Sequence, residues 1–213
     1  LAHRPPDSPA TRPAARRAAA ASPPPHPLPP PSSPSPPQVI YHFISGFTSK
    51  MAGTEEGVTK PVAAFSSCYG EPFLVWHPAK YATMLAEKLT EHSATAWLLN
   101  TGWLGGAGGQ RCPLKYSRAI VDAIHSGELA KAPTKVDAHF GLHYPTECAG
   151  VPPELLDPAS SWADKEGFAA TSRELAALFH KNFAEKKYAD AVEPAVVAAG
   201  PVGAHAYPIG KGE

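Results

Sequence analysis

Residues 95–111 read TAWLLNTGWLGGAGGQR, and this stretch decides the fold class. Its first five residues form a short apolar run, which predicts a buried strand. A glycine-rich loop follows, from Gly102 to Gly109. Residues 115–126 then carry apolar residues at helical spacing, and Gly127 supplies a stop signal. Because strand–loop–helix units build α/β folds, we expect an α/β protein.

The flanking sequence continues this alternation. The run from Val62 to Cys68 predicts a strand, and His77-Pro78 opens a helix with proline at the first helical position. Residues 136–142 predict another strand. Residues 165–187 predict the longest helix, whose apolar side consists of Phe168, Leu175, Leu178, Phe179 and Phe183. Strands that alternate with helices favour an α/β layer arrangement.

The first 38 residues differ from the rest in composition. They hold 14 of the 26 prolines and no aromatic residue. Proline lacks a backbone donor, and this segment has too little apolar bulk to form a core. We therefore predict a disordered tail over 1–38, a globular lobe over 39–201 and a flexible C-terminus over 202–213. The tail could be a transit peptide, a ligand for SH3 or WW domains, or an incidental extension.

Charge and cysteine usage exclude several protein classes. Lysine plus arginine and aspartate plus glutamate number 19 each, which argues against a general polyanion binder such as a nucleic-acid-binding protein. Three cysteines without a Cys-x-x-Cys pair do not indicate a disulfide framework or a zinc site, and they fit a reducing compartment. No apolar run reaches the ~18 residues that a membrane span needs. We expect a cytoplasmic protein without a membrane partner.

The glycine-rich loop is the first candidate binding site. In open α/β sheets ligands bind at such strand ends, and glycines let the backbone approach a ligand. Arg111 ends the loop with a guanidinium suited to a phosphate or a base, and Ser117 adds a hydroxyl in the first turn of the next helix. The alternative is a plain connection. The phosphate-binding pattern G-x-x-x-x-G-K-[ST] does not occur.

Two other features could carry chemistry. The polar segment from Ser45 to Pro61 is longer than an ordinary connection, which is typical of a lid and also of a solvated loop. The ten histidines are scattered and show no helical His-x-x-x-His or His-Glu-x-x-His spacing. We therefore assign no metal ligand to this chain.

Several motifs together resemble the ATP-dependent phosphoenolpyruvate carboxykinase family, especially its plant-like and fungal-like members. They fall in family order from about Tyr41 to Pro201, and the set is very specific. The proline-rich segment has no counterpart in this resemblance. The motifs span residues 41–48 (YHFISGFT), 52–55 (AGTE), 65–68 (FSSC), 100–103 (NTGW), 118–124 (RAIVDAI), 152–158 (PPELLDP) and 198–201 (AAGP).

The resemblance implies a fold, a reaction and its cofactors. It implies the C-terminal mononucleotide-binding lobe of a phosphoenolpyruvate carboxykinase, a carboxy-lyase of gluconeogenesis. The reaction converts oxaloacetate and ATP to phosphoenolpyruvate, carbon dioxide and ADP, with Mg²⁺ and Mn²⁺ holding the phosphates and the enolate oxygen. The implied partners are small-molecule substrates, without nucleic acid or membrane.

The resemblance also implies site residues. Arg111 and Ser117 match the family's Arg-x-x-x-x-x-Thr nucleotide motif, with serine in place of threonine, and Cys112 replaces an isoleucine. Ala52, Gly53, Thr54 and Glu55 resemble the start of the family's active-site lid. Lys60 stands where the family commonly has glutamate, a charge reversal in that lid.

The family's phosphate-binding loop, metal ligands and oxaloacetate-binding arginines have no counterpart in these residues. We therefore expect a fragment or truncated gene product that is inactive alone. Two alternatives remain open at this stage. One is a non-catalytic interaction protein with a proline-rich recruitment tail, and the other is a mispredicted gene product.

Overall fold

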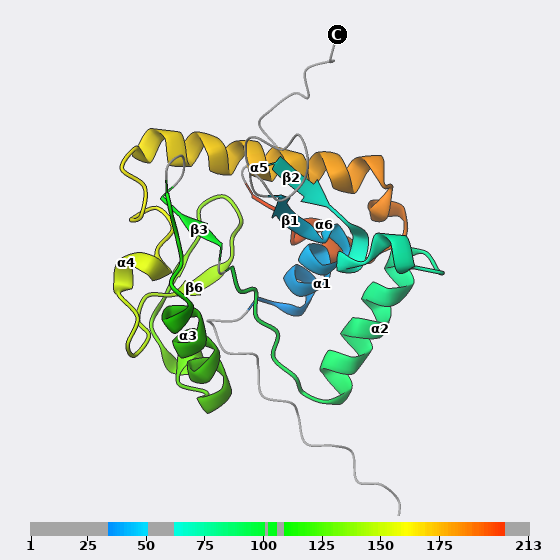
Figure 1. Ribbon diagram of the computed structural model, residues 1–213. Helices are drawn as coiled ribbons and strands as arrows, with labels where there is room; N and C mark the ends of the chain where they lie inside the picture. The colour runs from blue at the N-terminus through cyan, green and yellow to red at the C-terminus, as the bar shows by residue number, and fades with distance from the viewer. Residues whose placement is uncertain (1–33, 51–61, 101, 106–108, 203–213) are drawn as a thin grey trace, which may run out of the picture.

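The computed structural model describes residues 34–50, 62–100, 102–105 and 109–202 (Figure 1). In these residues the fold is mixed α/β, and its strands form three separate two-stranded antiparallel hairpins rather than one sheet. The hairpins are β1 (Phe47–Lys50) with β2 (Val62–Phe65), β3 (Trp103–Leu104) with β4 (Gln110–Arg111), and β5 (Thr134–Val136) with β6 (His143–Pro145).

The helices are α1 (Pro36–Ser45), α2 (Pro78–Glu91), α3 (Leu114–Ser126), α4 (Pro153–Leu156), α5 (Lys165–Glu185) and α6 (Pro194–Ala198). Four short 3-10 helices lie between them: η1 (Ser67–Tyr69), η2 (Glu71–Phe73), η3 (Leu129–Lys131) and η4 (Tyr188–Asp190).

The main hydrophobic core surrounds α1, which lies amid α2, α5 and α6 in the ribbon (Figure 1). The ring of Tyr41 stacks on Phe183 of α5 at a centroid distance of 4.5 Å. Gly200 lies against the same tyrosine, since a Cβ there would be 2.8 Å from its ring. The core consists of Ile40, Tyr41, Ile44, Ala79, Ala82, Phe179, Phe183, Tyr188 and Val196.

The β1–β2 hairpin is anchored to this core by aromatic side chains. Phe47 pairs with Phe65 across the hairpin, and both rings lie within 5.3 Å of the Phe179 ring, measured between centroids. The chain turns from α1 into β1 at Gly46, whose φ is +58°. A Cβ at Gly46 would be 1.7 Å from the carbonyl oxygen of Ser66, so glycine is required there.

A turn between β5 and β6 joins the two ends of the described chain. Asp137 Oδ1 accepts hydrogen bonds from the backbone N–H groups of His139 and Phe140, which shapes the turn. Gln38 Nε2 of α1 donates to the Gly141 carbonyl oxygen at 2.9 Å, and the Val202 N–H donates to the His139 carbonyl oxygen at 2.8 Å. The start of α1 and the end of the described chain therefore meet at one turn.

The helices follow the sequence prediction closely. Helix α2 begins at Pro78 after His77, α3 ends at Gly127, and α5 covers residues 165–185. One boundary differs: α1 begins at Pro36, inside the stretch assigned to the tail, because proline is compatible with the first helical turn. Residues 1–33 and 203–213 lie outside the described residues.

Three strand predictions need correction. Residues 95–99 are extended but pair with no described strand, so they form no buried strand. The predicted strand over 62–68 ends at Phe65, because Ser67 starts a 3-10 helix with Cys68 at a φ of +53°. The predicted strand over 136–142 is mostly the Asp137 turn, and only Val136 belongs to β5.

Candidate functional site: the β3–β4 hairpin and the start of α3

The glycine-rich loop is organised by a short hairpin. Trp103 pairs with Arg111 and Leu104 with Gln110, and the Cys112 N–H donates to the Gly102 carbonyl oxygen at 2.9 Å. Thr101 and residues 106–108 lie outside the described residues. The loop therefore leads from the extended segment 95–99 into α3, as predicted, but it does not follow a paired strand.

Two of the three predicted nucleotide-binding residues are in contact. Cys112 Sγ lies 3.9 Å from Ser117 Oγ, and Ser117 is buried in the first turns of α3. Pro113 precedes the helix, and its carbonyl oxygen accepts from the Tyr116 N–H at 3.0 Å. The hydroxyl of Ser117 is thus held against the strand that carries Arg111.

Three cationic side chains lie close to this contact in the sequence. Arg111 is exposed on β4, one residue before Cys112, and its side chain makes no hydrogen bond or ion pair within the described part of the chain. Lys115 and Arg118 are also exposed, and the Lys115 Nζ lies 4.7 Å from the centre of the Tyr116 ring. No acidic residue occurs between 111 and 118. Three cations beside the N-terminus of a helix favour an anion such as a phosphate group.

Lys115 and Arg118 were not identified as site residues from the sequence. The spacing of Lys115 and Arg118 is a signal that could have found them, because residues three apart share one face of a helix and both lie on α3.

The predicted lid residues Ala52, Gly53, Thr54 and Glu55 lie outside the described residues. The same holds for Lys60. The structure describes only the strands β1 and β2 that this segment connects.

The charge of the site suits a nucleotide phosphate. They contain no group of three or more His, Cys, Asp or Glu side chains able to hold a metal. The cationic side chains at 111, 115 and 118 suit phosphate oxygens.

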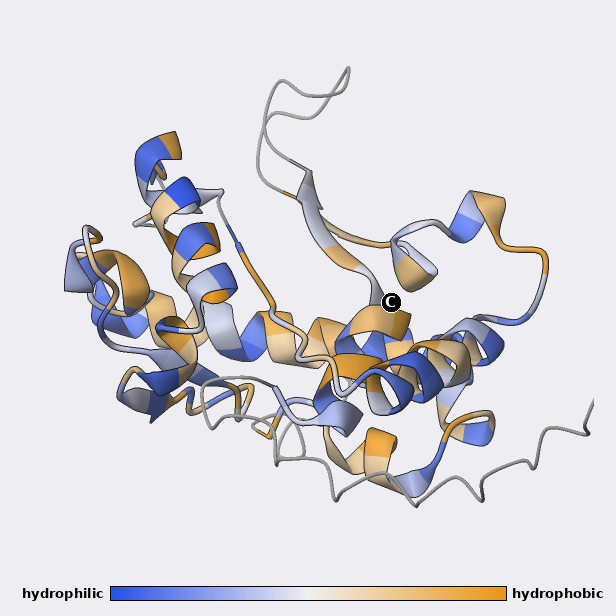
Figure 2. Ribbon diagram, turned by 90° about the horizontal axis from the view of Figure 1, so that it is seen from below, coloured by the Kyte–Doolittle hydropathy of each residue, from blue (hydrophilic) through white to orange (hydrophobic). Residues whose placement is uncertain are grey.

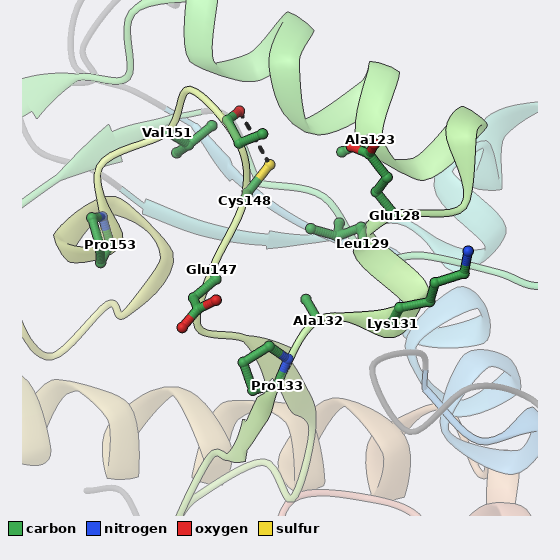
Figure 3. A pocket seen from close by; sticks show the side chains of 11 residues that line it. Ala123, Glu128, Leu129, Lys131, Ala132, Pro133, Glu147, Cys148, Val151 and Pro153 are labelled. Carbon is green, nitrogen blue, oxygen red and sulfur yellow. Dashed lines mark hydrogen bonds between the residues drawn. The ribbon is translucent and has the colours of Figure 1, made fainter.

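A cavity of about 570 Å³ lies elsewhere, at the opposite end of α3 (Figure 3). Its walls come from α3, η3 and the bridge between Cys148 and Val151. Burial, with a smaller contribution from the Glu128 carboxylate, raises the pKa of the Cys148 thiol. None of the predicted nucleotide-binding residues lines this cavity, so it is separate from the candidate site.

The described helices include none that is both long and apolar enough to cross a membrane.

Comparisons with known proteins identify a family for this chain. The family model described as phosphoenolpyruvate carboxykinase matches residues 26–154. Its match starts at residue 26, inside the proline-rich segment that was expected to have no counterpart.

Individual relatives carry the name phosphoenolpyruvate carboxykinase (ATP). The protein of Dictyostelium discoideum is 59% identical over 167 residues, which cover 78% of this chain and 29% of the relative. The protein of Emericella nidulans is 58% identical over 168 residues, covering 78% of this chain and 28% of the relative. The protein of Saccharomyces cerevisiae is 54% identical over 171 residues, which cover 78% of this chain and 31% of the relative. The chain thus spans less than a third of the relatives' length.

A family model that covers more than half of the chain, together with identities of 54 to 59%, establishes the relationship. The motifs around Arg111 and Ser117 lie inside the matched range. The chain belongs to the ATP-dependent phosphoenolpyruvate carboxykinase family.

Proposed function

We propose that this chain forms the C-terminal mononucleotide-binding lobe of an enzyme that converts oxaloacetate and ATP to phosphoenolpyruvate, carbon dioxide and ADP. In this reaction, loss of a carboxylate as carbon dioxide leaves an enolate, whose oxygen takes the γ-phosphoryl group of ATP and releases ADP. The observation that carries the proposal is the contact between Cys112 and Ser117 beside Arg111, at the family's nucleotide motif.

Each site residue has a distinct role in the proposal. The Arg111 guanidinium lies against the adenine base or a phosphate and supplies a fixed charge. The Ser117 hydroxyl forms a hydrogen bond with the nucleotide, and Cys112 packs beside the base. Lys115 and Arg118 raise the local concentration of the anionic substrate. Residues 52–61 act as the lid over the site.

Divalent metals supply charge neutralisation in this chemistry when bound, but the described side chains contain no set of ligands for them. In this proposal the 213 residues form one side of the nucleotide-binding site. We therefore expect the chain by itself to show no turnover above background with oxaloacetate and ATP.

The names of the relatives do not favour the alternative of a non-catalytic interaction protein.

A cytoplasmic location is also proposed. It rests on Cys68, Cys112 and Cys148, which are all free thiols and fit a reducing compartment.

Calorimetric titration with ATP tests the site. The chain is fused to the part of the Dictyostelium relative that it does not match, and variants are compared with this parent fusion. Arg111→Ala is expected to weaken ATP binding about tenfold or more, because a desolvated guanidinium contact is worth roughly 1–3 kcal/mol. Ser117→Thr should be tolerated, and Ser117→Ala should cost less than Arg111→Ala.

Arg173→Ala is the matched control, since Arg173 is an exposed arginine on α5, outside the site. It should leave the affinity for ATP unchanged. Equal affinities of the parent fusion and Arg111→Ala would remove Arg111 from the nucleotide site.

A further inference from the structure

The cavity at the end of α3 has a buried apolar lining (Figure 3). Ala123, Leu129 and Val151 line it and are at most 6% exposed. They come from α3, η3 and the bridge after β6, so three separate segments build one apolar surface. Figure 2 shows the ribbon from below, with apolar residues of α3 in orange between charged ones in blue. An apolar surface of this kind suits small aliphatic groups.

Two carboxylates flank this apolar surface. Glu128 follows α3 and Glu147 follows β6, and both are exposed and line the cavity. Lys131 also lines it, but Figure 3 shows its side chain on the opposite side from Glu147. Neither carboxylate forms an ion pair within the described part of the chain. They favour a cationic occupant, and guanidinium groups suit them best, because each can bind a carboxylate through two parallel hydrogen bonds.

The charge of the whole chain is divided between its parts. Residues 1–33, which lie outside the described residues, contain four arginines and one aspartate, a formal charge of +3. The other residues therefore carry −3, because the total is zero. Two of the arginines are adjacent, Arg16 and Arg17, in the run AARRAAAA over residues 14–21. Two guanidinium groups among alanines match two carboxylates beside an apolar surface.

We propose that residues 14–21 dock in this cavity of the same molecule. Arg16 and Arg17 then pair with the carboxylates of Glu128 and Glu147, and the neighbouring alanines cover the apolar lining. The proposal is independent of the nucleotide contacts, because none of the proposed nucleotide-binding residues lines this cavity.

The connection is long enough for docking within one molecule. Gln38 Nε2 donates to the Gly141 carbonyl oxygen at 2.9 Å, so the start of α1 lies beside the β5–β6 turn. Pro133, which lines the cavity, directly precedes β5 at the other end of this hairpin. Each strand has three residues, so the hairpin is about 10 Å long. The chain from Arg17 to Pro34 can span about 55 Å when extended.

The covalent connection makes a weak contact effective. Exposed ion pairs contribute little each, so the segment as a free peptide should bind with only millimolar affinity. Attachment to the same chain gives it an effective concentration on the order of 1 mM, so the cavity would be about half occupied or more. The same segment of a second copy, at about 10 µM, would occupy it only about 1% of the time.

Alkylation of Cys148 tests docking in the full 213-residue chain. Cys148 is a free thiol that lines the cavity, so a docked segment covers it. Its rate of reaction with N-ethylmaleimide is measured by mass spectrometry, and Cys112, outside the cavity, is the reference thiol in the same molecule. Arg16→Glu/Arg17→Glu should react at Cys148 at least about twofold faster than the parent, with an unchanged rate at Cys112.

Two controls separate docking from a general effect of charge. Arg4→Glu/Arg12→Glu makes the same change of charge outside residues 14–21 and should react like the parent. Sodium chloride at about 1 M should raise the rate of the parent to that of Arg16→Glu/Arg17→Glu, because it shortens the Debye length to about 3 Å.

Charge reversal in the cavity should restore docking. Glu128→Lys and Glu147→Lys, added to Arg16→Glu/Arg17→Glu, should return the rate at Cys148 to that of the parent. A lysine beside a thiol favours the reactive thiolate, so its direct effect is a faster reaction. A slower reaction in the fourfold variant is therefore due to docking.

Three results would overturn the inference. In the first, Arg16→Glu/Arg17→Glu reacts at Cys148 at the rate of the parent. In the second, Arg4→Glu/Arg12→Glu reacts as fast as Arg16→Glu/Arg17→Glu. In the third, protection increases as the chain concentration rises from about 1 to about 100 µM, which would place the segment on a second copy.

Discussion

Among the described glycines, Gly46 has the least space for a side chain. Its φ of +58° suits glycine, and a Cβ would be 1.7 Å from the Ser66 carbonyl oxygen and 2.9 Å from the Tyr69 nitrogen. We predict that Gly46→Ala lowers the free energy of unfolding by more than about 4 kcal/mol, because backbone atoms of two segments must separate. Urea unfolding of the variant measures this change.

Gly150 provides the control for this prediction. Its φ is also positive, at +74°, but nothing lies within 4 Å of a Cβ built there. Gly150→Ala should therefore cost only the conformational penalty, about 1–2 kcal/mol. Equal losses at both positions would show that the Ser66 contact is unimportant.

His42 couples stability to pH at the scale of one residue. It is buried among the rings of Tyr41, Phe140 and Phe179, and its Nε2 has no hydrogen-bond partner in the described structure. This burial lowers its pKa from 6.5 to about 4. Between these values the unfolded chain binds more protons than the folded chain, so stability present above pH 6.5 is lost as the pH falls.

We predict that the free energy of unfolding falls by up to about 3 kcal/mol through this group between pH 6.5 and pH 4. His42→Leu should flatten this part of the pH profile, measured by urea unfolding at several pH values. His125→Leu, at an exposed position on α3, should leave the profile as it is in the parent. A His42→Leu profile as steep as the parent's would contradict the assignment.

Among the secondary-structure elements, helices were predicted more completely than strands, of which only β2 was found over most of its length. The signals for α2, α3 and α5 are local: Pro78 in the first turn, Gly127 with a φ of +76° at the end, and the Asp164 carboxylate that caps the Gly167 N–H. Strand formation depends on partners distant in sequence, and residues 95–99 have the right composition but no described partner.

The candidate site was also predicted only in part from the sequence. The resemblance to the family's nucleotide motif implied Arg111, Cys112 and Ser117 as site residues, and the structure places Cys112 Sγ 3.9 Å from Ser117 Oγ. The order of strand, loop and helix indicated where the loop leads. It did not reveal the β3–β4 pairing of Trp103 with Arg111, because a hairpin of two residues per strand leaves almost no periodicity to detect.

One hydrogen bond links two elements that are distant in the chain. The hydroxyls of Ser67 in η1 and Tyr188 in η4 are hydrogen-bonded and buried. We predict that Ser67→Ala and Tyr188→Phe each lower the free energy of unfolding by about 1–3 kcal/mol, since each leaves the other hydroxyl buried without this bond. The double variant, measured by urea unfolding, should lose less than the sum of the two. Strict additivity would indicate that the bond contributes nothing.

At the scale of the whole molecule, the chain has two unequally packed parts. The buried core around α1, α2 and α5 is extensive. In the described residues from 95 to 164, only Ser117, Ala123, Leu129 and Val151 are buried. Less buried apolar surface means less stabilisation against local opening.

We therefore predict that α3 and the β5–β6 hairpin open without the α1 core. Their slowest amides should exchange at least about tenfold faster than those of α1 and α5 in native-state hydrogen exchange. If all four elements instead exchange at one common rate that follows global unfolding, the chain is a single cooperative unit.

The turn contacted by both Gln38 and Val202 has a consequence for the covalent order of the elements. Because the start of α1 and the end of the described chain meet at residues 139–141, a short linker can join residue 202 to residue 34 without crossing the core. A circular permutant with this linker, opened in the connection between α4 and α5, after Leu156 and before Lys165, would keep every helix intact. The order in which the helices are synthesised is therefore separable from the way in which they pack.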